Sequence, residues 1–71
     1  MQKIVSVNPD VLGGTPVFVG TRVPVAVLFE NLADGMNLEE ILDAYPTLTR
    51  DVALAALQCA EASLEREQIA G

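Results

Sequence analysis

The spacing of hydrophobic residues changes near Pro24 and divides the chain into two parts. Before Pro24, apolar and polar residues alternate around positions 4–7, and positions 17–19 form a second short apolar run. Such short runs, bounded by turn residues, predict strands at both places. Pro9 ends the first strand because proline has no amide hydrogen to donate to a partner. We therefore expect residues 1–23 to form an extended arm with turns.

From Pro24 onward, apolar residues recur every three or four positions, which predicts helices. The first helix begins at Pro24, because the fixed φ of proline suits the first helical position, and Gly35 ends it. Its apolar face carries Val25, Leu28, Phe29 and Leu32. The second helix starts with a capping box made by Asn37 and Glu40, and Pro46 ends it. Its apolar face carries Leu38, Ile41, Leu42 and Tyr45, whereas Glu39, Glu40 and Asp43 face water.

The third helix is expected over residues 50–68, with Thr49 as its N-cap. One broad side is apolar and consists mostly of alanine, so a neighbouring helix is expected to approach closely. That side carries Val52, Ala53, Ala56, Leu57, Ala60 and Leu64. The opposite stripe carries Asp51, Leu54, Gln58, Glu61 and Glu65. Cys59 is expected to be a small buried hydrophobic residue.

These elements predict a mainly α fold in a single domain of 71 residues. Short N-terminal β-strands lie within residues 1–23, and residues 24–71 form a three-helix bundle that is helix-turn-helix-like. A core of this size contributes only roughly 3–5 kcal/mol, and two strands alone form a marginal sheet. We therefore expect a homodimer in which the N-terminal strands pair between chains or pack on the other subunit.

The composition excludes several kinds of chemistry. Histidine is absent, which removes histidine acid–base catalysis and histidine metal sites. One cysteine makes neither an intrachain disulfide nor a thiolate metal cluster, and it indicates a reducing compartment. The sequence has no run typical of a signal peptide or of a membrane span. We expect a cytoplasmic protein that is not an enzyme, holds no cofactor or metal, and contacts no membrane.

Residues 13–22 (GGTPVFVGTR) are the segment most like a ligand loop. Glycine amides beside Arg22 suit a phosphate, but the segment matches neither a P-loop nor a dinucleotide fingerprint. A pair of tight turns around a strand is the favoured interpretation. Glu39, Glu40 and Asp43 suggest a carboxylate site, but a solvated helix face accounts for them more simply.

The charge balance bears on nucleic-acid binding. Ten acidic and four basic residues give a net charge of −6. The helix-turn-helix-like corner supports an alternative function, a DNA-binding regulator that represses its own operon. The candidate DNA contacts are Lys3, Arg22 and Arg50. The acidic stripe of the third helix repels phosphate, so dimerisation or a basic partner is needed to concentrate these cations.

Protein binding agrees better with the pattern. Val27 is expected on the polar side of the first helix and Leu54 within the acidic stripe of the third, so both are expected to be exposed. An acidic surface suits a basic partner such as a nuclease, whose groove it would cover. The residues predicted to contact that partner are Arg22, Val27, Leu54, Glu61 and Glu65.

Several short motifs occur in a distinctive order. They are Asn8-Pro9-Asp10, Gly13-Gly14-Thr15-Pro16, Gly20-Thr21-Arg22-Val23-Pro24-Val25, Gly35-Met36, Ile41-Leu42 and Tyr45-Pro46 with Leu48-Thr49. Over nearly the whole chain, their order and spacing resemble the small bacterial family catalogued as domain of unknown function 433. The resemblance implies a helix-turn-helix-like domain, usually encoded beside a PIN-like ribonuclease toxin.

The resemblance also implies a function. Members of that family are taken to be antitoxins of type II toxin–antitoxin modules, so we expect this chain to bind and inhibit a cognate PIN-like ribonuclease toxin. Operator DNA, bound together with the toxin, is a further expected partner. The resemblance carries no established set of catalytic or binding residues onto this sequence.

Overall fold

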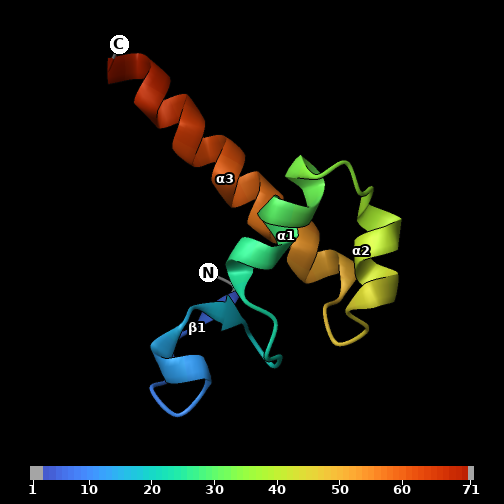
Figure 1. Ribbon diagram of the computed structural model, residues 1–71. Coiled ribbons are helices and arrows are strands. Elements are labelled where there is room, and N and C mark those ends of the chain that lie inside the picture. Colours follow the sequence, from blue (N-terminus) through green and yellow to red (C-terminus); the bar gives the residue numbers. More distant parts are fainter. Residues whose placement is uncertain (1–2, 71) are drawn as a thin grey trace.

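The computed structural model describes residues 3–70, and side chains up to residue 67, and it is mainly helical (Figure 1). A two-stranded antiparallel sheet comes first, formed by β1 (Val5–Ser6) and β2 (Val17–Phe18). Three helices follow, namely α1 (Val25–Ala33), α2 (Leu38–Ala44) and α3 (Arg50–Ala70). The mainly α fold expected from the sequence is therefore confirmed.

The two strands pair with each other within one chain, and Phe18 lies opposite Val5. After a turn at residues 19–22 the chain folds back, and the Phe18 amide donates to the carbonyl oxygen of Val23 at 2.9 Å. A bridge between Val17 and Pro24 extends this contact. β2 is thereby held on both sides, and among the described residues the outer edge of β1 is unpaired.

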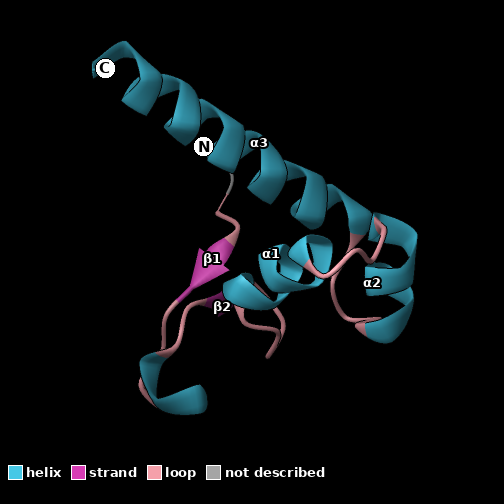
Figure 2. Ribbon diagram, turned by 45° about the horizontal axis from the view of Figure 1, so that its top comes forward, coloured by secondary structure: helices cyan, strands magenta, loops and turns pink. Residues whose placement is uncertain are grey.

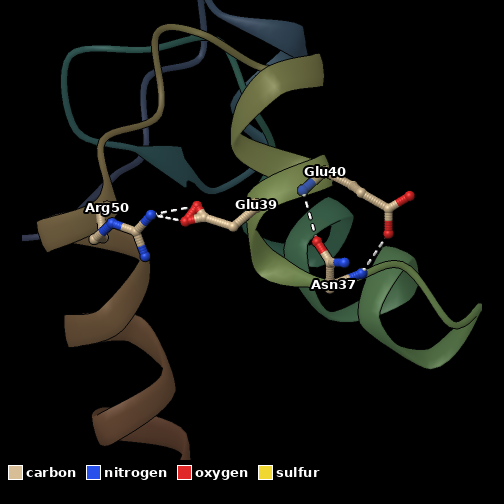
Figure 3. Close-up of polar contacts among 4 residues, drawn as sticks. All are labelled: Asn37, Glu39, Glu40 and Arg50. Carbon is tan, nitrogen blue, oxygen red and sulfur yellow. Dashed lines mark hydrogen bonds and ion pairs between the residues drawn. The ribbon is translucent and has the colours of Figure 1, made fainter.

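Local signals fix the junction between α1 and α2. Gly35 has φ +98°, and the amide of Met36 donates to the carbonyl oxygen of Asn31 at 3.0 Å. This hydrogen bond belongs to the Schellman motif, which closes a helix with glycine. The Glu40 amide then donates to Asn37 Oδ1, and the Asn37 amide donates to Glu40 Oε1, both at 2.9 Å (Figure 3). The predicted helix stop and the predicted capping box are both confirmed.

We expect Gly35→Ala to lower the free energy of unfolding by roughly 1–2 kcal/mol, the cost of holding an L-residue at a left-handed φ. A Cβ at this position would meet no atom within 4 Å, so the cost is conformational and includes no clash. Urea unfolding followed by circular dichroism measures the change. A variant as stable as the parent would contradict the helix end described here.

The core lies where the hairpin, α1 and α2 meet the first half of α3 (Figure 2). Three large side chains are fully buried: Phe18 of β2, Leu28 of α1 and Ile41 of α2. The other buried residues are Val17, Val23, Leu48, Ala53 and Ala56. α3 therefore contributes only alanines to the fully enclosed part of the core.

α3 continues well past this core. In both views its second half projects from the body with no other helix beside it (Figures 1 and 2). From Gln58 to Glu67 no side chain is buried. The predicted end of this helix near residue 68 agrees with the observed end at Ala70.

The exposure of some side chains and the first residue of α1 differ from what the sequence pattern predicts. Leu64 falls on the apolar side of α3 and Cys59 was expected to be buried, but both are exposed because they lie where α3 has left the body. Val27, expected to be exposed, is half-buried and packs against the core, because α1 is covered on more than one side. Pro24 is the N-cap of α1, one position before its first residue.

Candidate functional site

One surface hollow surrounds the turn that precedes α1, and we call it the Arg22 hollow. Its lining consists of Val11, Gly20, Thr21, Arg22, Val23, Pro24, Tyr45 and Thr47. Thr21 fixes the turn, because its hydroxyl donates to the carbonyl oxygen of Phe18 at 2.8 Å and accepts from the Val23 amide at 3.0 Å. Arg22 is exposed and has no ion pair among the described side chains. A rigid turn thus presents one cation at the edge of this hollow.

The glycine pair lies outside the Arg22 hollow. Leu12, Gly13 and Gly14 form a separate turn in which φ is +51°, +65° and +92°. The Thr15 hydroxyl closes this turn by donating to the carbonyl oxygen of Leu12 at 2.8 Å. Two tight turns therefore flank β2, as the favoured interpretation has it, and the glycine amides do not join Arg22 in one hollow.

A second hollow lies between α1 and α3, and we call it the α1–α3 groove. Its lining consists of Phe29 from α1 with Leu57, Ala60, Glu61, Leu64 and Glu65 from α3. The floor is apolar, and Leu64 is 65% exposed. Glu61 and Glu65 lie one helical turn apart, and no basic residue lines the groove. The groove is thus an apolar surface with a negatively charged edge.

Three of the five residues predicted to contact a partner share one side of α3. At about 100° per residue, Leu54, Glu61 and Glu65 fall within about 40° of one another around the helix axis. All three are exposed. Arg22 lies in the other hollow, and Val27 packs against the core. Of the predicted set, Glu61 and Glu65 therefore line the α1–α3 groove, whereas Leu54, Arg22 and Val27 do not.

The residues predicted to contact DNA come from three different places. Lys3 precedes β1, Arg22 lies in the turn before α1, and Arg50 begins α3. The guanidinium of Arg50 pairs with the carboxylate of Glu39 on α2 (Figure 3). One of the three cations is therefore already engaged with an acidic side chain.

We expect Glu39→Gln to change the free energy of unfolding by less than about 1 kcal/mol, as is typical of exposed ion pairs. The side chains of Arg50 and Glu39 are 53% and 59% exposed, so water and salt screen their attraction. Urea unfolding at low and high salt measures the contribution. A loss of several kcal/mol would show that the pair is far more important to the fold than its exposure implies.

The acidic side chains of the described residues are not grouped into a metal site. All ten Asp and Glu side chains are exposed. Among the described residues, no three His, Cys, Asp or Glu side chains are grouped to hold a metal ion. None of the helices in the described range is both long and apolar enough to cross a membrane. The Arg22 hollow and the α1–α3 groove are candidate binding surfaces of the described chain.

Comparison with known proteins identifies one family. The family described as "Protein of unknown function (DUF433)" matches residues 5–60. The uncharacterized protein y4eO of Sinorhizobium fredii is 44% identical over 62 residues, which are 87% of this chain and 28% of that protein. The crystal structure of a DUF433 member protein from Anabaena variabilis has a TM-score of 0.71 and 32% sequence identity, over 99% of this chain and 71% of that chain.

These matches differ in how much of each protein they cover. This chain spans little more than a quarter of the length of the y4eO protein. The family match ends at residue 60, so Glu61, Leu64 and Glu65 of the α1–α3 groove lie beyond it.

Proposed function

This chain belongs to the DUF433 family, and we propose that it acts as the antitoxin of a type II toxin–antitoxin module. In this role it binds a PIN-like ribonuclease toxin and inhibits it. The proposal includes a cytoplasmic location and no catalytic activity of the chain itself.

The observation that carries the proposal is the exposed Leu64, which continues the apolar side of α3 past the half-buried Leu57 and Ala60. Leu64 lines the α1–α3 groove together with Leu57 and Ala60, but 65% of its surface is exposed in the described chain. Removing a leucine side chain from water contributes roughly 1.5–3 kcal/mol. A partner that covers Leu64 would therefore bury apolar surface that is exposed in the lone chain, and this burial would stabilise the complex.

The charge of the chain supports a nuclease as that partner. A surface that binds RNA carries lysine and arginine to neutralise phosphates. This chain has a net charge of −6, with every carboxylate exposed, so it would attract such a surface and compete with RNA for it. Binding and inhibition thus follow from the same charge pattern.

Arg22 suggests a second element of the mechanism. PIN-like nucleases are expected to hold divalent metal ions with clustered carboxylates. An exposed arginine on a rigid turn is suited to pair with such carboxylates and to block their access to metal or RNA. A hydrogen bond between charged groups of this kind contributes roughly 1.5–3 kcal/mol.

Operator binding is proposed for the complex with the toxin. The exposed stripe of α3 is acidic, and Arg50 is paired with Glu39, so the lone chain has few cations available for phosphate. A basic toxin would add the charge that DNA binding requires. Gel-shift assays at stated salt should show promoter binding with both proteins present, and tight binding by the chain alone would favour the regulator instead.

We also propose that the chain forms a homodimer through its N-terminal arm. Val7, Leu12 and Val19 are exposed apolar residues of the arm, and the outer edge of β1 has no strand beside it in the described chain. Such an edge favours pairing with another strand. Sedimentation at tens of micromolar should give a dimer, and a monomer at that concentration would count against this arrangement.

An RNA cleavage assay tests the proposed function. The nuclease encoded by the adjacent gene is titrated with the purified chain, and cleavage should stop near an equimolar ratio. Undiminished cleavage at a molar excess of the chain would reject the proposal. An adjacent gene that encodes no PIN-like protein would remove its premise.

A further inference from the structure

The α1–α3 groove is the part of the surface that internal packing leaves incomplete. Leu57 and Ala60 are half-buried, whereas Leu64, further along the same side of α3, is 65% exposed. Phe29 of α1 is the one residue lining the groove that does not belong to α3. The second half of α3 continues away from the body (Figure 2). Apolar surface thus runs from the core out into solvent.

The charges that line this groove all have the same sign. Glu61 and Glu65 line it, and its other lining residues are uncharged. The nearest basic residue along the chain, Arg66, lies at least about 100° around the helix axis from every α3 residue of the groove. Within two turns of Glu61 and Glu65, the negative edge therefore has no basic residue on its own side of the helix.

We propose that the α1–α3 groove binds one amphipathic helix of the partner nuclease. The apolar face of that helix carries aliphatic side chains, and its flanks carry Lys or Arg opposite Glu61 and Glu65. This assignment depends on the proposed function and adds the position and chemistry of the contact.

A helix is the form of partner that this surface fits. The exposed side of a helix accepts the side-chain ridges of another helix, and such contacts are made through apolar side chains spaced one turn apart. Lysine or arginine beside the apolar face would donate charge-assisted hydrogen bonds to Glu61 and Glu65. The floor thus provides affinity, and the acidic edge selects a basic partner.

A second copy of this chain fits the groove poorly. A two-fold contact centred on the groove brings the same patch from both subunits together. Glu61 and Glu65 of each copy would then face their own counterparts, and like charges across an interface oppose association. The net charge of −6 on each copy adds to that repulsion.

Titration calorimetry of the full chain with the nuclease encoded by the adjacent gene tests this assignment. Leu64→Ala removes the exposed apolar group and keeps a strong helix former, so it should raise Kd about tenfold without unfolding the chain. The double variant Glu61→Lys, Glu65→Lys reverses the charge at the edge of the groove, so it should raise Kd about tenfold or more at low salt. The increase in Kd should become smaller as the salt concentration rises, because salt screens exposed charges.

The double variant Asp34→Lys, Asp43→Lys is the matched control. Both residues are exposed, neither lines the α1–α3 groove, and the pair undergoes the same charge change as Glu61→Lys, Glu65→Lys. This control should leave Kd near the value of the unaltered chain. Circular dichroism spectra of all variants should match, because every substituted residue is exposed.

Each outcome either supports the α1–α3 groove as the nuclease-binding site or excludes it. Weaker binding in both groove variants, with Asp34→Lys, Asp43→Lys near the parent value, supports the groove. A nuclease that binds the groove variants as tightly as the parent overturns the groove and leaves the proposed function standing. Failure of the unaltered chain to bind rejects the proposed function and this assignment with it. If Leu64→Ala abolishes self-association and leaves nuclease binding intact, the occupant is a second copy and the proposal is wrong.

Discussion

Phe18→Ala is expected to leave the chain largely unfolded at room temperature. Phe18 is fully buried and belongs to the core cluster that also contains Leu28 and Ile41. Truncating a buried phenylalanine costs roughly 3–5 kcal/mol. A core in a chain of this size provides roughly the same 3–5 kcal/mol in total. The substitution therefore removes about as much free energy as the fold has available.

Val19→Ala is the control for this substitution. Val19 is the next residue along the chain, but it is 37% exposed and lies outside the core cluster. Its truncation should cost less than about 1 kcal/mol. Far-UV circular dichroism and urea unfolding compare the two variants. If Phe18→Ala unfolds cooperatively near the midpoint of the unaltered chain, the core described here is wrong.

Ala53→Leu is expected to lower the free energy of unfolding by roughly 1–3 kcal/mol, the usual cost of overpacking. Ala53 has no exposed surface and lies where α3 meets the core. A larger side chain there has no free volume, so it must push α3 away from its neighbours or adopt a strained rotamer. Burial of the added apolar surface does not compensate for this cost, because α3 then packs less closely against the rest of the core.

The same substitution at Ala62 separates packing from helix propensity. Ala62 lies on the same helix and is exposed, so Ala62→Leu should change the free energy of unfolding by less than about 0.5 kcal/mol. Thermal and urea unfolding of both variants give the comparison. Equal losses at the two positions would contradict the close packing of α3 on the core.

The helices were predictable because their boundaries depend on local chemistry. Asn37 and Glu40 close the capping box without help from distant residues. Gly35 adopts the positive φ that ends α1. At the start of α3, the Val52 amide donates to the Thr49 hydroxyl at 3.3 Å, as expected of an N-cap. Such interactions span only a few residues, so the sequence alone indicates them.

Exposure along α3 was less predictable. Helical spacing gives the side of the helix on which a residue lies, but it does not say where the neighbouring elements end. Leu64 and Cys59 are exposed for this reason, although one falls on the apolar side and the other was expected to be buried. Val27 shows the opposite error, because elements on more than one side of α1 cover it.

Leu12 shows a further limit of sequence reasoning. Its φ of +51° is uncommon for a large side chain, and leucine gives no signal for it. The conformation is imposed by the turn that the chain must make between β1 and β2. The neighbouring Gly13 and Gly14 adopt positive φ without this strain, because glycine has no Cβ to oppose it.

The candidate sites depend on contacts between distant segments. Arg50 and Glu39 are 11 positions apart on different helices, and no local sequence pattern indicates that they pair. Phe29 was assigned to the apolar face of the first helix, so its place beside Glu61 and Leu64 was missed. Only the packing of α1 against α3 brings these side chains into one groove.

Amide hydrogen exchange along α3 tests most directly whether this chain works by being held against another macromolecule. In the lone chain, amides of residues 58–67 should exchange faster than those of residues 52–56, because the core and the apolar side chains packed against it end at Leu57. Adding the nuclease encoded by the adjacent gene in excess should slow exchange over residues 58–67 by at least about tenfold. Exchange over residues 58–67 that stays the same with and without the nuclease would contradict this claim.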